Sequence, residues 1–542
     1  MVEKNQVLIL DITDMSLEGD GIGKTAEGYT FFVKGAVLGD KAEVVVTKAN
    51  KTYGFAKAVK VLEQSPYRTE PICPVSRQCG GCTLSELSYS AQLAIKKDIV
   101  KNNLLKIGRY PEGSYILEDI ISSPKIEEYR NKAQYPVAFE NGRAIAGFYE
   151  RRSHRVIACK DCKLQPKAMN EIVAACLSYI NENQISVYDE KSHKGTVRNI
   201  YLREGSCGFM VCLVTNSEKP LPKVEKLLEK LKPYPVISVL QNINTKKTNV
   251  VLGDHNILLF GEEFIEEQIG DKTFLVSPLS FFQVNSLQVK NLYDKAKEYA
   301  QIEDTDTVFD LYCGVGSIGI YLADHAKKLI GVEWVESATQ NAKKNAQRNG
   351  IKNAEFYAGD CGKIVKDLVA KGEKADVVIV DPPRKGCSED LLDLIGEINP
   401  KRVVYISCNS ATLARDVAIL NEKGYTMTKC TPVDMFPHTS HVETIVLLSK
   451  LYPDDRIEVD LDLDELDITA AESKATYEEI KAYIRDKYGF KVSSLYIAQT
   501  KTKCGIIERI NYNLSKKGTR VPKCPPDKEN AIKDALRHFG MI

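Results

Sequence analysis

The sequence has little net charge, no long apolar run and no internal repeat. No apolar stretch approaches the ~20 residues that a membrane-spanning helix needs, and the N-terminus MVEKNQVLIL lacks the long apolar core of a signal peptide. We therefore expect a cytoplasmic protein with no membrane partner. The net charge of +1 excludes a broadly basic surface but not a nucleic-acid partner, because basic patches can be local.

Composition and length are those of a soluble globular protein with several domains. Hydrophobic residues make up 43% of the 542 and charged residues 27%, and this length predicts roughly three or four domains. The fifteen cysteines are informative, because in a reducing compartment they serve as metal ligands, catalytic thiols or core residues rather than as disulfides.

Residues 1–60 contain short β-like runs (QVLILDIT, YTFFVK, KAEVVVTKAN, GFAKAVKVLE) between turn signals such as EGDGIGK and VLGD. This pattern predicts a small β-barrel. The stretch 47–60 carries four lysines, Tyr53 and Phe55, and no acid. Lysines beside exposed rings suit a nucleic-acid backbone and its bases, although a solvated barrel face would show the same composition.

The middle of the chain divides into a mixed and a regular part. Residues 61–265 are predicted to form a central α+β domain with a cysteine-rich loop. From 266 to 450, strand-length apolar runs such as TVFDLYCG, KLIGVE, ADVVIVDPP and KRVVYISCN alternate with helix-like stretches. This alternation predicts a Rossmann-like α/β domain, in which helices cover both faces of a parallel sheet and ligands bind at the carboxyl ends of the strands.

The loop DLYCGVGSIG (310–319) follows a strand and opens a helix, and Gly314 and Gly316 let a ligand approach its backbone. Glu333 ends the next strand and Asp360 the strand after it. An acid at the end of the second strand, here Glu333, suits ribose hydroxyls. The acid at the end of the third strand, Asp360, could accept a hydrogen bond from an adenine amino group. The three features together predict a nucleoside pocket.

Two more strand ends carry chemistry. In DPPRKG (381–386), two prolines after an acid make a rigid, extended loop that aims Asp381 into the crevice. In YISCNSATLARD (405–416), Cys408 lies where an apolar strand ends and a helix begins. A single free cysteine is usually a small core residue. This thiol is a candidate nucleophile because the neighbouring strands also end in residues suited to ligand binding.

A cysteine cluster is predicted in the central domain. CPVSRQCGGC gives the spacing C-x5-C-x2-C, and a fourth thiol is available from ACKDC, which offers Cys159 and Cys162. Four thiolates fit either a tetrahedral zinc or a [4Fe–4S] cluster, and spacing alone does not decide between them. A radical S-adenosylmethionine enzyme typically has C-x3-C-x2-C, which this sequence lacks.

Six motifs in series resemble one family: SFFQVN (280–285), DLYCGVGSIG, GVE (331–333), DPPRKG, SCN-x-ATLARD and FPHTSHVE (436–443). In order and spacing, residues 1–450 resemble the 23S ribosomal RNA (uracil-5-)-methyltransferases that carry a TRAM domain and an iron–sulfur cluster. The resemblance implies a class I methyltransferase fold behind an N-terminal TRAM/OB-like barrel. It also implies a monomer that acts on a single-stranded or loop uridine of 23S ribosomal RNA.

The resemblance assigns roles to residues of this sequence. It implies S-adenosylmethionine as the methyl donor, with cofactor contacts from Gln283, Tyr312, Glu333, Asp360 and Asp381. It implies that Cys408 is the nucleophile and Glu443 the base. It selects the [4Fe–4S] cluster over zinc, with ligands Cys73, Cys79, Cys82 and Cys162, and leaves Cys159 as a bystander.

The chemistry of uracil explains why a thiol and a carboxylate are needed. Carbon 5 is a poor nucleophile until a thiolate adds to carbon 6, and a base must later remove the proton of carbon 5. We expect the helix that starts after Cys408 to favour the thiolate. Where the family usually has proline, this chain has Ser410, which we expect to cap that helix. The alternatives are a transfer-RNA uracil-5-methyltransferase and a non-catalytic RNA-binding protein.

The end of the chain lies outside the resemblance. Residues 451–473 are predicted to form an acidic linker. Residues 474–542 hold fifteen Lys and Arg against seven Asp and Glu, a charge of +8, and are predicted to form a small basic module. We expect this charge to add RNA affinity, because phosphates are bound largely through Lys and Arg.

Overall fold

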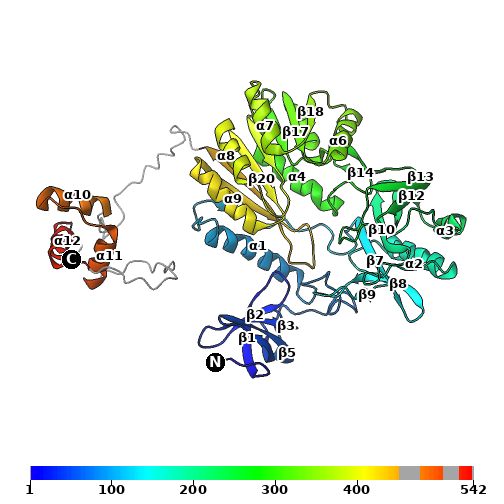
Figure 1. Ribbon diagram of the computed structural model, residues 1–542, viewed down its shortest axis with the longest axis horizontal. Helices are drawn as coiled ribbons and strands as arrows, with labels where there is room; N and C mark the ends of the chain where they lie inside the picture. The colour runs from blue at the N-terminus through cyan, green and yellow to red at the C-terminus, as the bar shows by residue number, and fades with distance from the viewer. Residues whose placement is uncertain (1, 451–476, 505–523, 540–542) are drawn as a thin grey trace. The chain divides into compact units, whose positions relative to one another are not determined.

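The computed structural model describes residues 2–450, 477–504 and 524–539. The chain separates into two compact units, Met1–Asp455 and Arg456–Ile542 (Figure 1). Among the described residues, no helix is both long and apolar enough to cross a membrane.

The N-terminal strands close into a barrel in the order β1-β2-β3-β5-β4, which confirms the predicted small β-barrel. The strands are β1 (Val7–Met15), β2 (Gly21–Lys24), β3 (Thr30–Lys34), β4 (Lys41–Ala49) and β5 (Tyr53–Glu63). The predicted turn EGDGIGK was wrong in part, since β2 lies within it. Glycine is needed there because a Cβ on Gly21 would lie 2.7 Å from Ile12 Cγ2 and 2.8 Å from the Ala36 carbonyl oxygen.

The central sheet has seven strands in the order β13-β12-β11-β10-β7-β8-β9. They are β7 (Lys132–Glu140), β8 (Arg143–Tyr149), β9 (Val156–Ala158), β10 (Val197–Gly205), β11 (Gly208–Thr215), β12 (Val236–Ile243) and β13 (His255–Gly261). Helices α2 (Lys167–Glu182) and α3 (Val224–Leu231) pack on one face around Ile172 and Leu227. The hairpin β14 (Ile265–Ile269) and β15 (Lys272–Val276) joins the core shared with the next sheet.

The third sheet has eight strands in the order β18-β17-β16-β19-β20-β22-β21-β6. They are β6 (Ile116–Leu117), β16 (Thr307–Leu311), β17 (Lys328–Glu333), β18 (Ala354–Ala358), β19 (Val377–Val380), β20 (Arg402–Ser407), β21 (Tyr425–Val433) and β22 (Glu443–Lys450). From β18 to β20 all neighbours are parallel, and β22 is antiparallel to both β20 and β21. This arrangement confirms the predicted α/β fold of residues 266–450.

Helices cover both faces of this sheet (Figure 1). One face carries α4 (Ser286–Ala300), α5 (Ser317–Leu322), the short 3-10 helix Ala323–His325 and α6 (Glu336–Arg348). The other carries α1 (Tyr89–Lys106), α7 (Cys361–Ala370), α8 (Glu389–Ile398) and α9 (Ser410–Glu422). Both α1 and β6 come from the chain predicted as the central domain, yet they pack against α9 and β21.

The second unit contains three described helices, α10 (Tyr477–Tyr488), α11 (Ser494–Lys503) and α12 (Pro526–His538). They enclose an apolar core that includes Ile480, Ile484, Ile497, Ile532 and Leu536. The predicted acidic linker, 451–473, lies outside the described residues.

Candidate active site

The glycine-containing loop after β16 turns away from the strand and then opens α5. Tyr312, Gly314 and Gly316 all have left-handed backbone conformations, with φ of 64°, 55° and 79°. A Cβ on Gly314 would meet nothing within 4 Å, so the backbone there faces open space. Glu333, at the end of β17, accepts a hydrogen bond from the Gly314 amide at 3.1 Å. The predicted nucleoside loop and the second-strand acid are therefore in contact.

Asp310, inside the apolar strand β16, was not singled out from the sequence. Its carboxylate is fully buried and accepts a hydrogen bond from the Gly319 amide at 2.9 Å, which holds the start of α5 against the strand. Burial, helped by the charges of Asp381 and Glu333, raises the pKa of Asp310 to about 7. The sequence feature that could have identified Asp310 is an acidic residue within the otherwise apolar run TVFDL.

Asp381 follows β19 and is half-buried. Withdrawal from water raises its pKa to about 7. Its charge also raises the pKa of Asp310, Glu443 and Cys408, so it lies near all three groups. The crevice gathers several carboxylates whose mutual repulsion a cationic ligand would relieve.

Cys408 and Glu443 lie next to each other across two strands, although 34 residues separate them in the sequence. The antiparallel pair β20 and β22 places Ser407 opposite Thr444, so the residue after the first strand faces the residue that begins the second. Cys408 is half-buried and Glu443 is 3% exposed. The strand register thus brings together the two residues to which the resemblance assigns the roles of nucleophile and base.

The sequence suggested that the helix start after Cys408 would lower the pKa of the thiol. This prediction was wrong. Burial, with the nearby charges of Glu443 and Asp381, raises the pKa of Cys408 to about 11. Burial and the charge of Asp381 likewise raise the pKa of Glu443 to about 8. In the free protein near neutral pH, both groups are therefore mostly protonated.

Among the described residues, Arg384 is the cation whose charge opposes both of these shifts, and it was not identified from the sequence. Its charge lowers the pKa of Cys408 and of Glu443. Its carbonyl oxygen accepts hydrogen bonds from Asn409 Nδ2 at 3.1 Å and Thr412 Oγ1 at 3.3 Å, which join the DPPRKG loop to the loop of the thiol. Its place directly after the two prolines was the available signal.

Asn409, not Ser410, caps helix α9. The Asn409 side chain accepts a hydrogen bond from the Ala411 amide at 3.1 Å. The Ser410 hydroxyl instead accepts one from Asn103 Nδ2 of α1 at 2.8 Å. The predicted capping role of Ser410 was wrong, because Ser410 is already the first residue of the helix and Asn409 occupies the cap position.

The segment before Glu443 is held by α1. Lys96 is fully buried, forms an ion pair with Asp434 and donates to the Phe436 carbonyl at 2.9 Å. The His438 amide donates to Gln92 Oε1 at 2.8 Å. Burial lowers the pKa of His438 to about 4, so this side chain is a neutral part of the loop.

The cysteine loop, residues 73–84, contacts the same segment before Glu443. The Leu84 amide donates to the His438 carbonyl at 2.9 Å, and the Ser440 amide donates to Thr83 Oγ1 at 3.0 Å. The Ser440 hydroxyl donates to the Leu17 carbonyl in the connection between β1 and β2. The barrel and the cysteine loop therefore help to position the chain that leads to Glu443.

The predicted metal ligands lie in one neighbourhood. Cys73, Cys159 and Cys162 share an apolar cluster, with Cys82 packed against it. Burial raises the pKa of Cys79, and the charges of Cys162 and Cys73 add to this shift. Thiolates are suitable donors for zinc or an iron–sulfur cluster. Over the described parts of the chain, however, no three His, Cys, Asp or Glu side chains adopt an arrangement that could hold a metal ion.

The remaining predicted cofactor residues differ in setting. Gln283 is buried, and its carbonyl oxygen accepts a hydrogen bond from Asn131 Nδ2 at 3.1 Å. Asp360 is exposed and caps α7 by accepting from the Lys363 amide at 3.0 Å, so its helix-capping role is independent of any ligand. Trp334, the only Trp of the chain, follows Glu333 and is 69% exposed, which leaves its ring available beside the cofactor loop.

A groove of about 710 Å³ separates the barrel from α1. On the barrel wall, the ring centroids of Phe32, Tyr53 and Phe55 lie 5.7–5.9 Å apart, and the Arg152 guanidinium lies 5.6 Å from that of Phe55. On the α1 wall lies Asn103, which contacts Ser410 two residues after the thiol. This groove can hold unstacked bases next to the crevice.

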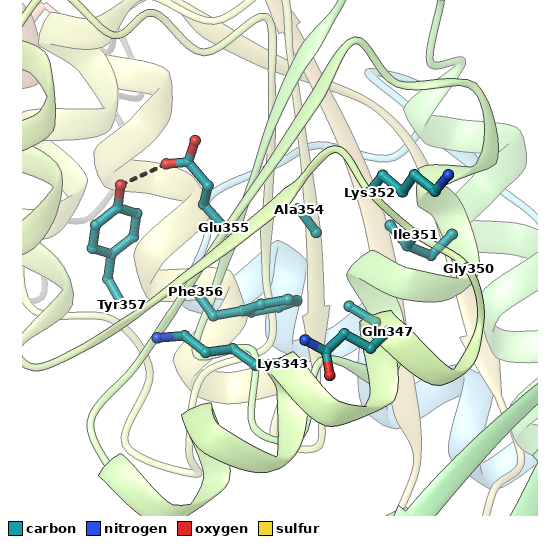
Figure 2. A pocket seen from close by; sticks show the side chains of 10 residues that line it. Lys343, Gln347, Gly350, Ile351, Lys352, Ala354, Glu355, Phe356 and Tyr357 are labelled. Atoms are coloured by element: carbon teal, nitrogen blue, oxygen red, sulfur yellow. Dashed lines mark hydrogen bonds between the residues drawn. The ribbon is translucent and has the colours of Figure 1, made fainter.

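A second cavity, of about 720 Å³, lies between α6 and the outermost strand β18 (Figure 2). Figure 2 shows Lys343, Lys352 and Glu355 at its wall, and the Tyr357 hydroxyl donates to Glu355 at 2.6 Å. The residues that line it, all within the described chain, include no Cys, His or Asp. The predicted residues Glu333, Asp381 and Cys408 lie instead at the carboxyl ends of parallel strands.

Comparison with known proteins agrees with this geometry. The family model for tRNA (uracil-5-)-methyltransferases matches residues 88–451, and that for the TRAM domain matches residues 2–59. An uncharacterized RNA methyltransferase of Clostridium tetani is 43% identical over 451 residues, which cover 83% of this chain and 97% of the relative. One of Oceanobacillus iheyensis is 43% identical over 453 residues, with the same coverage.

A solved structure extends the comparison to the fold and the cofactor. The tRNA (uracil-54, C5)-methyltransferase of Pyrococcus abyssi, in complex with S-adenosyl-L-homocysteine, superposes with a TM-score of 0.65 at 30% identity. The match covers 81% of this chain and all of that chain. The chain belongs to the RNA (uracil-5-)-methyltransferase family and is an S-adenosylmethionine-dependent RNA methyltransferase with an N-terminal TRAM domain.

Proposed function

We propose that the protein methylates carbon 5 of a uridine in 23S ribosomal RNA through a covalent adduct between Cys408 and carbon 6 of the base. The observation that carries this proposal is the register of β20 and β22, which brings Cys408 beside Glu443 at the ligand edge of the sheet. A further support is Asp381, whose charge raises the pKa of both groups and also that of Asp310, just before the glycine-containing loop.

S-adenosylmethionine supplies an activated methyl group and carries positive charge on its sulfonium and amino groups. We propose that Glu333, Asp381, Tyr312 and Gln283 bind it, and that Asp360 contributes from the rim. The raised pKa values of Asp310 and Asp381 fit this assignment, because a cation in the crevice stabilises their ionised forms. The exposed ring of Trp334 is available to cover the adenine.

The reaction follows from the two neighbouring side chains. Cys408 loses its thiol proton to water, the thiolate adds to carbon 6, and the electron pair of the 5,6 double bond is delocalised over carbon 5 and the 4-oxygen. Carbon 5 would take the methyl group as the bond from that group to the sulfonium sulfur breaks, which would release S-adenosylhomocysteine, and carbon 5 would then carry both methyl and hydrogen. Glu443 removes that proton, the 5,6 double bond reforms, and the thiolate leaves. Arg384 assists by favouring the ionised forms of Cys408 and Glu443.

The target base must leave its stack to reach a half-buried thiol. We propose that the groove between the barrel and α1 holds the nucleotides that flank it. This proposal is supported by the side chains grouped at the groove, which are Phe32, Tyr53, Phe55 and Arg152. Rings and cations together bind single strands without reading a sequence. The contact between Asn103 and Ser410 connects this groove to the loop of the thiol.

We further propose that Cys73, Cys79, Cys82 and Cys162 hold a [4Fe–4S] cluster, with zinc as the alternative. The support is their common neighbourhood and their thiol chemistry, and no step of methyl transfer runs through the cluster. Protein purified without oxygen should contain iron and acid-labile sulfide. Stoichiometric zinc without iron would reverse the assignment.

Transfer RNA is the second candidate substrate, because the Pyrococcus abyssi neighbour is a tRNA methyltransferase and the match includes the whole of its chain. The deciding experiment incubates the protein with labelled S-adenosylmethionine and either unmodified 23S ribosomal RNA or unmodified transfer RNA, then maps 5-methyluridine. We expect label in the ribosomal RNA. Label in transfer RNA alone would select the second candidate, and label in neither would reject uracil-5 methylation of these two RNAs.

A further inference from the structure

The C-terminal unit is additional to the methyltransferase. The family match ends at residue 451, whereas this unit spans Arg456–Ile542. It has an apolar core of its own. None of the residues to which we assign a role in methyl transfer comes from it. A function for this unit must therefore be read from its own surface.

That surface carries a row of lysines and aromatic rings along the second half of α10, the connection to α11 and the starts of α11 and α12. The lysine–ring row consists of Tyr483, Lys487, Tyr488, Phe490, Lys528 and Tyr496. Each member contacts the next through a ring, so the row is continuous rather than a set of scattered charges.

The distances show this continuity. Lys487 Nζ lies 5.1 Å from the ring centroid of Tyr483 and 5.7 Å from that of Tyr488. The Tyr488 and Phe490 centroids are 6.0 Å apart. Lys528 Nζ then lies 6.0 Å from Phe490 and 5.9 Å from Tyr496. Ammonium groups at such distances from ring centroids are attracted to the ring faces.

Part of the row packs against the core of the unit, and part of it is exposed to solvent. Tyr483, Phe490 and Tyr496 pack against the apolar core of the unit, so these rings are already ordered. Tyr488 is 41% exposed, and the side chain of Lys487 is 49% exposed. Ordered rings lose little conformational entropy when a ligand binds.

One acid lies within the row. Asp534 accepts hydrogen bonds from Lys487 Nζ at 2.8 Å, from the Tyr488 hydroxyl at 2.9 Å and from the Tyr483 hydroxyl at 3.1 Å. It fixes these side chains and offsets one charge, while Lys528 and the rest of the +8 in residues 474–542 remain. The row therefore offers ordered rings within a positively charged unit.

We propose that the lysine–ring row binds a single-stranded RNA segment. Lysines would contact successive phosphates while bases stack on Tyr488 and its neighbours, a combination that binds single strands without reading their sequence. A protein partner is less well matched, because lysine is depleted in most protein interfaces. Since the unit is covalently joined to an RNA methyltransferase, a second RNA contact raises overall affinity through effective concentration.

The test uses the full-length chain and measures binding without S-adenosylmethionine, so its outcome does not depend on which RNA is methylated. In the row variant, Lys487→Gln, Tyr488→Ala and Lys528→Gln are combined, and a short fluorescent oligouridine is the probe. We expect Kd to rise about tenfold, a conservative result for lost stacking and two lost phosphate contacts. The slope of log Kd against log salt should fall by about 1.4.

A matched control removes the same number of lysines elsewhere on the unit. Lys503→Gln with Lys533→Gln acts on two lysines that both pair with Glu529, and we expect Kd to change less than about twofold because neither lysine belongs to the lysine–ring row. Tyr488→Ala alone, at an exposed ring outside the apolar core, should keep the unfolding transition of the wild type and still weaken binding.

Three results would overturn the proposal. Binding by the row variant equal to that of the wild type would remove the site. An equal loss in the control variant would show that only total charge matters. An equal loss toward duplex DNA and single-stranded RNA would show a general polyanion surface rather than a single-strand site.

Discussion

Cys408 and Glu443 lie side by side, yet different parts of the chain hold them in place. The loop of Cys408 is fixed mainly by neighbours in its own domain, through the Asn409 cap and the Arg384 carbonyl. The loop before Glu443 is fixed from the N-terminal fifth of the sequence, including Lys96 of α1 and Leu84 of the cysteine loop. Formation of the adduct should therefore depend on local structure, and its resolution on distant segments.

Substitution of the two side chains themselves gives the largest expected contrast. Cys408→Ala should abolish methylation, because carbon 5 is not activated without the thiolate. Glu443→Gln should permit methyl transfer but trap the RNA, because the proton of carbon 5 is no longer removed. Denaturing gels with labelled RNA detect the trapped adduct. An active Cys408→Ala protein would contradict the mechanism.

Lys96→Met should be the next largest effect, since it leaves Asp434 buried and unpaired. Loss of one partner of a buried pair costs about 3–5 kcal/mol, which denaturant unfolding measures. Because this pair holds the segment that leads to Glu443, adduct should accumulate more than it does in the wild type. The control Lys96→Met with Asp434→Asn should recover much of the stability. Equal slowing of adduct formation and resolution would remove the contrast between the two loops.

Arg384→Gln should shift the pH dependence of the reaction. The pKa of Glu443 is about 8, so the wild-type rate of adduct resolution should rise as pH increases from 6 to 9 and the carboxyl ionises. Loss of the Arg384 charge raises the pKa of both Glu443 and Cys408, which moves this rise to higher pH. We expect a loss of about tenfold near pH 7, for a shift of about one unit. Single-turnover rates for the wild type, Arg384→Gln and Arg384→Lys test this, with Arg384→Lys close to the wild type.

Asn103→Ala should have the smallest effect. It removes the hydrogen bond from α1 to Ser410, the described side-chain contact by which that helix reaches the loop of the thiol. A lost hydrogen bond of this kind costs about 1 kcal/mol, or a few-fold in the rate of adduct formation. Asn102→Ala, at the neighbouring residue of the same groove, is the control. A loss as large as that of Lys96→Met would mean that α1 supports both loops equally.

The sequence was most informative where chemistry and periodicity coincide. Each predicted run from TVFDLYCG to KRVVYISCN contains a strand, and the residues that end these strands meet at one edge, because parallel strands place their carboxyl ends together. The antiparallel pairing of β22 was not evident, so the proximity of Cys408 to Glu443 could not be predicted from periodicity. Strand register depends on which residues of two strands lie opposite each other, and the periodicity within one strand does not contain that information.

Two kinds of information were beyond a local pattern. The pKa of Cys408 was assigned the wrong direction, because the helix start is visible in the sequence whereas the burial and the nearby acids are products of the fold. The contacts of α1 were also missed, since an amphipathic stretch shows that a helix has a buried face but not which neighbour covers it. Asp310 and Arg384 lay inside recognised motifs and could have been identified there.

The hydrogen bond between the Ser440 hydroxyl and the Leu17 carbonyl has a consequence for the order of synthesis. Its partners are 423 residues apart, so a chain still on the ribosome can complete the barrel long before the segment that carries Glu443 has been made. The late segment must then find a surface that is already folded. RNA contacts on the barrel can therefore be available before the chain is able to react, and methylation becomes possible only when the last strand of the sheet closes the structure.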